Sequence, residues 1–171
     1  MESLPMYDLV DRPAAMLGRS GRLLLWAMRG WHRAQDSGTA PPVALNRAFA
    51  SLGIAPILSD FHVAMSLLTT MGPDRISRSP LDSPRIGEGE AVLLTLWADT
   101  ASKREDQAER TLTLLTGQNL AGPLSSAMAA TLDGLEACGF GTADMLGLAR
   151  PGQAGKRTAL PADVLSVPDR P

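Results

Sequence analysis

Apolar side chains recur every three or four residues through most of the chain, a spacing that places them on one face of an α-helix. In residues 19–35, for example, Leu24, Met28 and Trp31 fall on one side. Glycine or proline separates each such stretch from the next, as is typical of helix ends. The pattern predicts further helices at residues 41–52, 56–72, 88–100, 102–116 and 123–138, and a short one at 142–148.

The connections between these helices are short, which favours antiparallel neighbours. We therefore expect an all-α fold, an irregular antiparallel bundle of about six helices. Aromatic residues make up only 4% of the chain, so Leu, Ala and Met must supply most of the core. Residues 72–87 contain three prolines, which forbid a long helix and predict a loop.

The pattern divides the chain into one folded domain and two flanking segments. The periodic region spans residues 18–149. Residues 1–17 are interrupted by two prolines, and we expect a loosely ordered arm there. Residues 150–171 are rich in Pro, Gly, Lys and Arg without a periodic apolar face, which predicts a disordered tail.

The charge of the chain argues against nucleic acid as a partner. The net charge is −2 and the isoelectric point is near 5.6, whereas nucleic-acid-binding domains are usually basic. Residues 48–54 resemble the turn of a helix-turn-helix, but the following helix carries Asp60 and lacks the basic or amide side chains that read bases. We expect no nucleic-acid binding.

Several features favour the cytoplasm. No run of apolar residues reaches the length of a membrane span. The first residues lack the basic start and apolar stretch of a secretory signal. The single cysteine, Cys138, has no partner for an internal disulfide.

The residues that usually carry chemistry are scarce. His32, His62 and Cys138 are the only histidines and the only cysteine, and a structural zinc site needs four ligands at recognisable spacing. The chain lacks a Gly-x-Ser-x-Gly elbow and a His-Glu-x-x-His pair. We therefore predict no catalytic residues, metal or cofactor, and an enzyme is the last of our hypotheses.

The most directed surface feature is a stripe along residues 19–35. Arginine and tryptophan recur there at helical spacing, which is typical of a face that grips an acidic partner or lies on an anionic membrane. A solvated face with a half-buried tryptophan is the simpler interpretation. The candidate partner-binding residues are Arg22, Trp26, Arg29 and Arg33.

Helical bundles also bind small apolar ligands between their helices. Large apolar side chains at helical spacing in the predicted third and fourth helices would line such a pocket. The candidate lining residues are Phe61, Met65, Leu96 and Trp97.

Small residues recur at intervals of four along the predicted helix 123–138 and would let another helix approach closely. This seam would serve either a homodimer or packing within the chain, and we favour the second. Its residues are Ser126, Ala130, Gly134 and Cys138.

The order of several motifs resembles a family of short bacterial proteins of unknown function, over about residues 20–140. The shared motifs are Arg-Leu-Leu-Leu-aromatic-Ala-x-Arg in the first helix, a glycine after the second, a Leu-rich third, and a Pro-Arg turn before an acidic helix start. Their positions here are residues 22–29, Leu52 and Gly53, residues 58–71, and Pro84, Arg85 and Glu90.

The resemblance implies a helical fold and brings no known activity. Members of that family tend to carry cysteines just before the Pro-Arg turn. This chain has Leu81, Asp82 and Ser83 there, so a thiol or metal role is not carried over.

These observations together favour a non-catalytic helical interaction or regulatory protein, acting through a protein partner or as a homodimer. A binder of a small apolar ligand between helices is the first alternative. Peripheral association with a membrane surface through residues 19–35 is the second.

Overall fold

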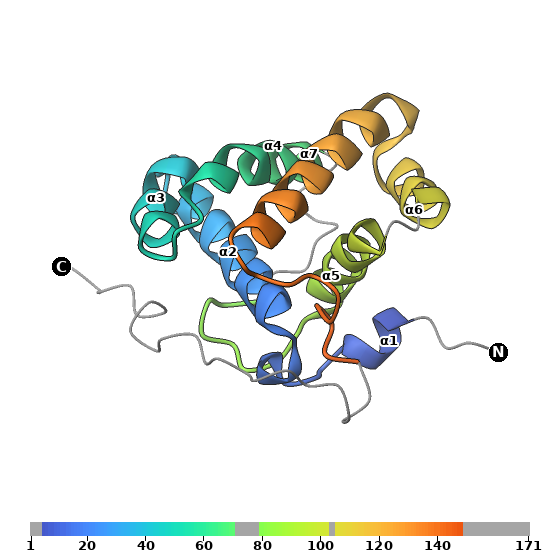
Figure 1. Cartoon of the computed structure of the whole chain (residues 1–171), viewed down its shortest axis with the longest axis horizontal. Coiled ribbons are helices and arrows are strands. Elements are labelled where there is room, and N and C mark those ends of the chain that lie inside the picture. Colours follow the sequence, from blue (N-terminus) through green and yellow to red (C-terminus); the bar gives the residue numbers. More distant parts are fainter. Residues whose placement is uncertain (1–4, 71–78, 103–104, 149–171) are drawn as a thin grey trace.

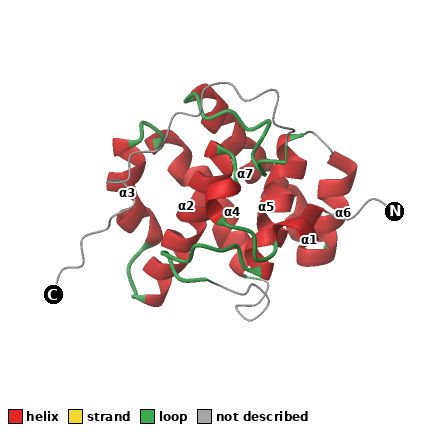
Figure 2. Ribbon diagram, turned by 90° about the horizontal axis from the view of Figure 1, so that it is seen from below, coloured by secondary structure: helices red, strands yellow, loops and turns green. Residues whose placement is uncertain are grey.

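The computed structural model describes residues 5–70, 79–102 and 105–148, and every regular element in them is helical, which confirms the all-α prediction (Figure 1, Figure 2). The elements are α1 (Pro5–Leu9), α2 (Arg19–Asp36), α3 (Pro41–Ser51), α4 (Leu58–Thr69), α5 (Glu88–Ala101), α6 (Glu105–Thr116) and α7 (Gln118–Ala137), with single 3₁₀ turns at Ala14–Met16 and Ala55–Ile57.

Helices α4 and α7 form the most extensive helix pair, and α6 packs on another part of α7. Helix α2 packs on α3 and also contacts α5, while α1 lies against α5. In Figure 1, α2 runs between the α3–α4 side of the molecule and the lower end, where α1 and the segment after α7 also lie. Helix α2 is therefore surrounded by other elements over much of its length.

A row of aromatic rings connects four helices through the core, although aromatic residues are few. Trp26 of α2 lies 6.3 Å from Phe49 of α3, measured between ring centroids. Phe49 lies 5.9 Å from Phe61 of α4, and Phe61 lies 6.4 Å from Trp97 of α5. Each such pair stabilises a fold by about 0.5–1.5 kcal/mol beyond the area that it buries. The row fixes how α2 to α5 meet.

The predicted helix boundaries agree with the structure to within three residues, except at the start of α7, which is predicted at residue 123. Helix α7 begins at Gln118, five residues before Pro123, which lies inside it. Gly117, with φ +75°, turns the chain immediately before the helix. Pro123 has no N–H to donate to the carbonyl of Asn119, but Asn119 is exposed, so water can satisfy that carbonyl.

The described residues 5–17 of the expected loose arm are packed against the body. Leu9 is fully buried, because α1 lies against α5, and Leu17 is nearly so. The amide of Ala14 donates to the carbonyl of Pro84 at 2.8 Å. These apolar contacts and hydrogen bonds hold the segment in place.

The expected short helix at residues 142–148 is wrong, since the segment forms turns. It is held by contacts with α2 instead of by its own helical bonds. Gly18 donates its amide to the carbonyl of Met145 at 3.0 Å, and Ser20 donates its hydroxyl to the carbonyl of Gly141 at 2.9 Å. A Cβ at Gly21 would collide with the carbonyl oxygen of Met145, so glycine is what permits this close approach.

Two predictions lie outside the described residues: the disordered tail at residues 150–171 and the first part of the loop at residues 72–87.

Candidate functional site

Helix α2 passes through the core and nevertheless carries several arginines. Most of its residues are buried, among them Arg29 and His32. A buried arginine needs a countercharge and several hydrogen-bond acceptors. The partners of each arginine on α2 therefore show which side chains serve the fold.

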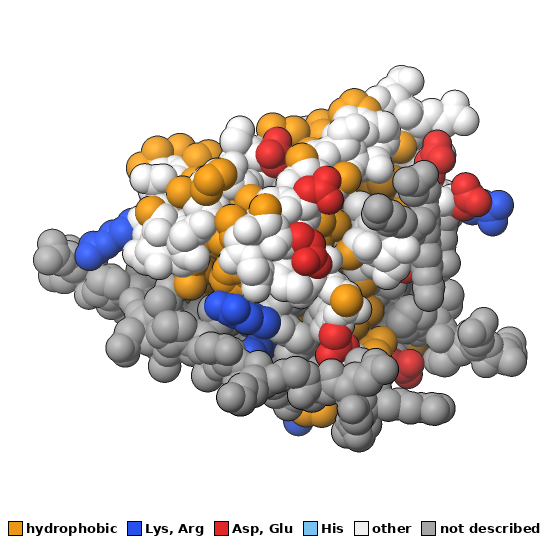
Figure 3. Space-filling view, viewed as in Figure 1, with side chains coloured by type: hydrophobic (Ala, Val, Ile, Leu, Met, Phe, Trp, Pro, Cys, Tyr) orange, Lys and Arg blue, Asp and Glu red, His pale blue; other side chains and the backbone are white. Residues whose placement is uncertain are grey.

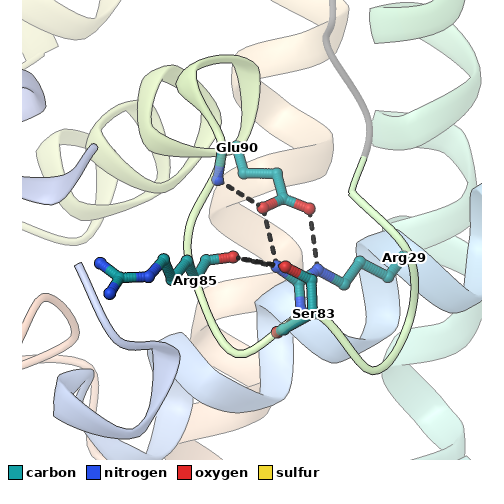
Figure 4. Close-up of polar contacts among 5 residues, drawn as sticks. Arg29, Ser83, Arg85 and Glu90 are labelled. Carbon is teal, nitrogen blue, oxygen red and sulfur yellow. Dashed lines mark hydrogen bonds and ion pairs between the residues drawn. The ribbon is translucent and has the colours of Figure 1, made fainter. Parts of the chain in front are cut away.

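Arg29 forms a buried, two-pronged ion pair with Glu90, the third residue of α5 (Figure 4). Its Nε donates to Oε1 of Glu90 at 2.8 Å, and its Nη2 donates to Oε2 at 2.9 Å. The side chains are only 5% and 7% exposed. This parallel geometry is the strongest arrangement of an arginine and a carboxylate.

The remaining hydrogen bonds of the pair hold the loop before α5. Nη1 of Arg29 donates to the carbonyl of Ser83 at 2.7 Å, and Nη2 donates to the carbonyl of Arg85 at 2.8 Å. Oε2 of Glu90 also accepts the amide of Gly87 at 2.9 Å, as a helix-capping glutamate does. Figure 4 shows the carboxylate of Glu90 and the loop carbonyls gathered around the guanidinium of Arg29. The pair thus fixes both the loop and the start of α5.

The surroundings keep Glu90 ionised. Burial by itself raises the pKa of this carboxyl, but the hydrogen bonds and charge of Arg29, the amide of Gly87 and the hydroxyl of Ser79 lower it by more. The net result is a pKa below the usual value. Both oxygens of this carboxylate are held by Arg29 and by the amide of Gly87, so the pair stabilises the start of α5.

Two further arginines continue the junction through backbone carbonyls. Nη1 of Arg85 donates to the carbonyl of Asp11 at 2.8 Å, and the amide of Asp11 donates to the carbonyl of Ile86 at 2.9 Å. Nη1 of Arg12 donates to the carbonyl of Leu146 at 3.2 Å. We call Arg12, Arg29, Arg85 and Glu90 the polar junction. It joins the N-terminal segment, α2, the loop before α5 and the segment after α7.

Arg22 and Trp26 of α2 differ from the polar junction, because their buried donors have no acceptor. Nε of Arg22 and Nε1 of Trp26 are both buried without a hydrogen-bond partner. Residues four apart on a helix lie on the same side, one turn from each other. Trp26 is 8% exposed, and Arg22 is partly buried. The two form a pair of unsatisfied donors, which is uncommon in folded proteins.

The predicted stripe of Arg22, Trp26, Arg29 and Arg33 is therefore not a continuous surface. Arg29 points inward, because Glu90 of α5 supplies a buried countercharge that the sequence of α2 alone does not reveal. Trp26 is mostly covered, with Phe49 of α3 beside it. Arg33 is exposed. Among the four residues of the stripe, Arg22 and Arg33 have side chains that reach the surface.

The candidate pocket residues are brought together in the core, from α4 and α5. Each of them is at most 1% exposed, and the rings of Phe61 and Trp97 are stacked with an interplanar angle of 25°. The indole Nε1 of Trp97 is buried without a hydrogen-bond partner. The set comprises Phe61, Met65, Leu96 and Trp97. A small apolar ligand at this position stays a prediction.

Both histidines lie beside the ring of Trp31, with centroid distances of 5.3 Å for His32 and 6.0 Å for His62. Nδ1 of His62 accepts a hydrogen bond from Nε1 of Trp31 at 3.0 Å, which fixes its ring. Cys138 is exposed at the end of α7. Within residues 5–70, 79–102 and 105–148, no three or more His, Cys, Asp or Glu side chains gather as metal ligands would.

The small-residue seam of α7 is split between the interior and the surface. Gly134 faces Ile57, and a Cβ there would collide with that side chain. Ser126, Ala130 and Cys138 are exposed. Packing within the chain thus accounts for Gly134 and not for the rest of the seam.

No protein-family model, curated protein or solved structure matched the chain. The resemblance to short bacterial proteins of unknown function stays a prediction. The function is therefore argued from the residues of the chain itself.

Proposed function

We propose that this chain is a non-catalytic helical interaction protein, which binds a protein partner through the outer side of the N-terminal half of α2. The observation that carries the proposal is the pair of unsatisfied donors, Nε of Arg22 and Nε1 of Trp26. Figure 3 shows basic side-chain atoms at the surface over this part of α2.

The energetic argument is that a buried donor without an acceptor costs about 1–3 kcal/mol. Arg29, on the same helix, has an acceptor for each of its three guanidinium nitrogens. The chain itself thus supplies all the hydrogen-bond acceptors that the buried Arg29 needs. An acceptor from another molecule would satisfy the donors of Arg22 and Trp26 and remove this cost. The unsatisfied donors therefore support partner binding at these two residues.

Association with a membrane surface receives less support from α2. A helix that lies on a membrane exposes an apolar face to the lipid. The large apolar residues of α2 are instead buried in the core, including Leu23, Leu24 and Met28. None of the described helices is both long and apolar enough to cross a bilayer.

A ligand inside the bundle is the second candidate, because Nε1 of Trp97 lacks an acceptor in a fully buried position. A bound molecule with an acceptor oxygen next to Trp97 would complete that donor. Native mass spectrometry of protein purified gently from its own cells tests this. An added mass of a few hundred daltons supports the ligand, and a co-purifying protein chain supports the partner.

Photo-crosslinking tests the proposed function directly. A photo-reactive benzoylphenylalanine at position 16, an exposed site just before α2, is expected to give a covalent adduct with one protein in the native cell. Adding Arg22→Glu should remove the adduct by reversing the charge at the site. The folded state of each variant is checked by circular dichroism.

The matched control carries the same photo-reactive residue at Glu109, an exposed site on α6, on the other side of the molecule in Figure 1. The proposal is wrong if both positions give the same adducts, or if Arg22→Glu leaves the adduct from position 16 unchanged.

A further inference from the structure

A third donor group stands beside Arg22 and Trp26 at the start of α2. Arg19 is exposed, and its Cζ lies 4.2 Å from the centroid of the Phe140 ring. A guanidinium held over an aromatic face keeps its N–H edge free to bind an acceptor. The spacing of 19, 22 and 26 puts all three side chains on neighbouring turns of the same side of the helix.

The charge at this end of α2 opposes the helix dipole. The N-terminus of a helix is its positive end, where acidic side chains are favoured and basic ones are disfavoured. The first turn of α2 has no acidic residue, and Gly18 at its N-cap makes no side-chain hydrogen bond. Arg19 and Arg22 add positive charge there instead. A bound anion would offset the repulsion between these arginines and the positive end of the helix, and it would accept hydrogen bonds from the donors.

The two acidic side chains nearest in sequence to Phe140, Glu136 and Asp144, are both already engaged in interactions of their own. The carboxylate of Glu136 accepts both the amide and the hydroxyl of Thr142 at 2.6 Å. These hydrogen bonds hold the pKa of Glu136 below its usual value. Glu136 therefore stabilises the turn after α7, and its contacts there do not include Arg19 or Arg22 among the described residues.

Two guanidinium groups and an indole N–H can only donate hydrogen bonds. Their natural complement is a group with several acceptor lone pairs and a negative charge, which in a protein is the carboxylate of Asp or Glu. We propose that the face formed by Arg19, Arg22 and Trp26 binds carboxylates of an acidic protein segment. The inference rests on the proposed function and names the chemistry of the partner.

Fluorescence anisotropy with a defined peptide tests the inference on the full chain. The probe is a short labelled peptide of alternating Asp and Gly, and its matched control has Asn in place of Asp. We expect the acidic peptide to bind and the Asn peptide not to bind. Binding should weaken as the salt concentration rises from about 20 to about 200 mM, because exposed charges are screened.

Variants of the chain locate the binding site. Arg22→Gln and Arg19→Gln should each weaken binding of the acidic peptide by about tenfold or more, as expected for a charge-assisted hydrogen bond. Trp26→Phe keeps the aromatic packing and removes the N–H, and should weaken binding severalfold. Arg110→Gln removes the same charge from an exposed site on α6 and should leave binding unchanged.

Three results would overturn the inference. The first is equal binding of the acidic and the Asn peptides, and the second is equal weakening by Arg110→Gln and Arg22→Gln. The third is binding to vesicles of phosphatidylserine and phosphatidylcholine without binding to the acidic peptide, which would favour an anionic membrane. If the crosslinked adduct forms and the acidic peptide does not bind, the proposed function stands and only the carboxylate chemistry is wrong.

Discussion

Arg22 and Arg29 lie on the same helix about two turns apart, yet the fold treats them in opposite ways. Arg29 is enclosed, and its guanidinium binds a carboxylate and two backbone carbonyls. Arg22 is partly buried, and its Nε has no acceptor. The difference teaches that burial of an arginine does not by itself assign a role. The role of such an arginine depends on whether the chain supplies hydrogen-bond acceptors for its guanidinium.

The contrast gives each region its own test. Changes at the polar junction should affect the free energy of unfolding. Changes at Arg19 and Arg22 should affect partner binding and leave the stability nearly unchanged. Any variant that moves both properties together would break the comparison.

The largest effect is expected from Glu90→Ala. It leaves the charge of Arg29 buried without a countercharge and removes the acceptor for the amide of Gly87. Breaking a buried ion pair in this way costs about 3–5 kcal/mol. Urea denaturation followed by circular dichroism measures the change in the free energy of unfolding.

The control for this prediction is Glu88→Ala, which removes an exposed acidic residue from the same first turn of α5. It should cost less than about 1 kcal/mol, the usual range for a charge near a helix end. Equal losses in the two variants would show that the ion pair does not stabilise the fold.

A smaller effect is expected where α2 meets the segment after α7. Gly21→Ala places a methyl group against the carbonyl of Met145. Displacing that backbone should cost about 1–3 kcal/mol, as overpacking does. Gly141→Ala, in the segment after α7, is the control, because it meets open space without a positive φ and should be neutral or raise stability by up to about 1 kcal/mol. Thermal unfolding compares them, and a neutral Gly21→Ala would mean that the contact is loose.

The sequence predicts the helices well where apolar periodicity and helix-stop residues agree. Residues 19–35 and 41–52 are examples, because glycine or proline bounds each. It fails for residues 142–148 and says little about residues 5–17, because both segments have too few periodic apolar residues to reveal their packing. Both are held by hydrogen bonds to segments far away in the chain, such as Gly18 to Met145, and local patterns do not contain that information.

The candidate site shows the same limit. Helical spacing groups Arg22, Trp26, Arg29 and Arg33 on one stripe, but it does not say which arginine meets an acid from another helix. One signal was present: Arg29 stands among Trp26, Met28 and Trp31, in a part of the helix that is otherwise apolar. A charge in such a place predicts a buried partner. Choosing Glu90 as that partner requires the packing of α2 on α5.

A moderate effect is expected at acidic pH. The folded pKa of Glu90 lies below the usual 4.5, so its ionised form contributes stability that is fully present above about pH 4.5. This contribution is lost as the pH falls further through the folded pKa. The loss should be smaller than in Glu90→Ala, because a protonated carboxyl still accepts hydrogen bonds through its carbonyl oxygen.

Urea denaturation at about pH 5.5 and about pH 3.5 measures this dependence. Glu90→Gln should flatten it. Glu136→Gln should also flatten it, since the pKa of Glu136 is lowered as well, by the hydrogen bonds of Thr142. If Glu90→Gln keeps the full slope of the parent chain, the ion pair is not what titrates.

The smallest effect on stability is expected from Arg22→Met, and it sharpens the comparison most. The change keeps the apolar stem of the side chain, and it removes a donor that has no acceptor and a charge that opposes the dipole of α2. Removing an unsatisfied donor is neutral or favourable, so the free energy of unfolding should stay the same or rise by about 0.5–1 kcal/mol. Binding of the acidic peptide should be lost in the same variant.

The comparison variant, Arg29→Met, should instead be strongly destabilised, because it leaves the carboxylate of Glu90 buried without a countercharge. If Arg22→Met lost nearly as much stability as Arg29→Met, Arg22 would also have a structural role. That result would contradict the proposal that this face of α2 binds a partner.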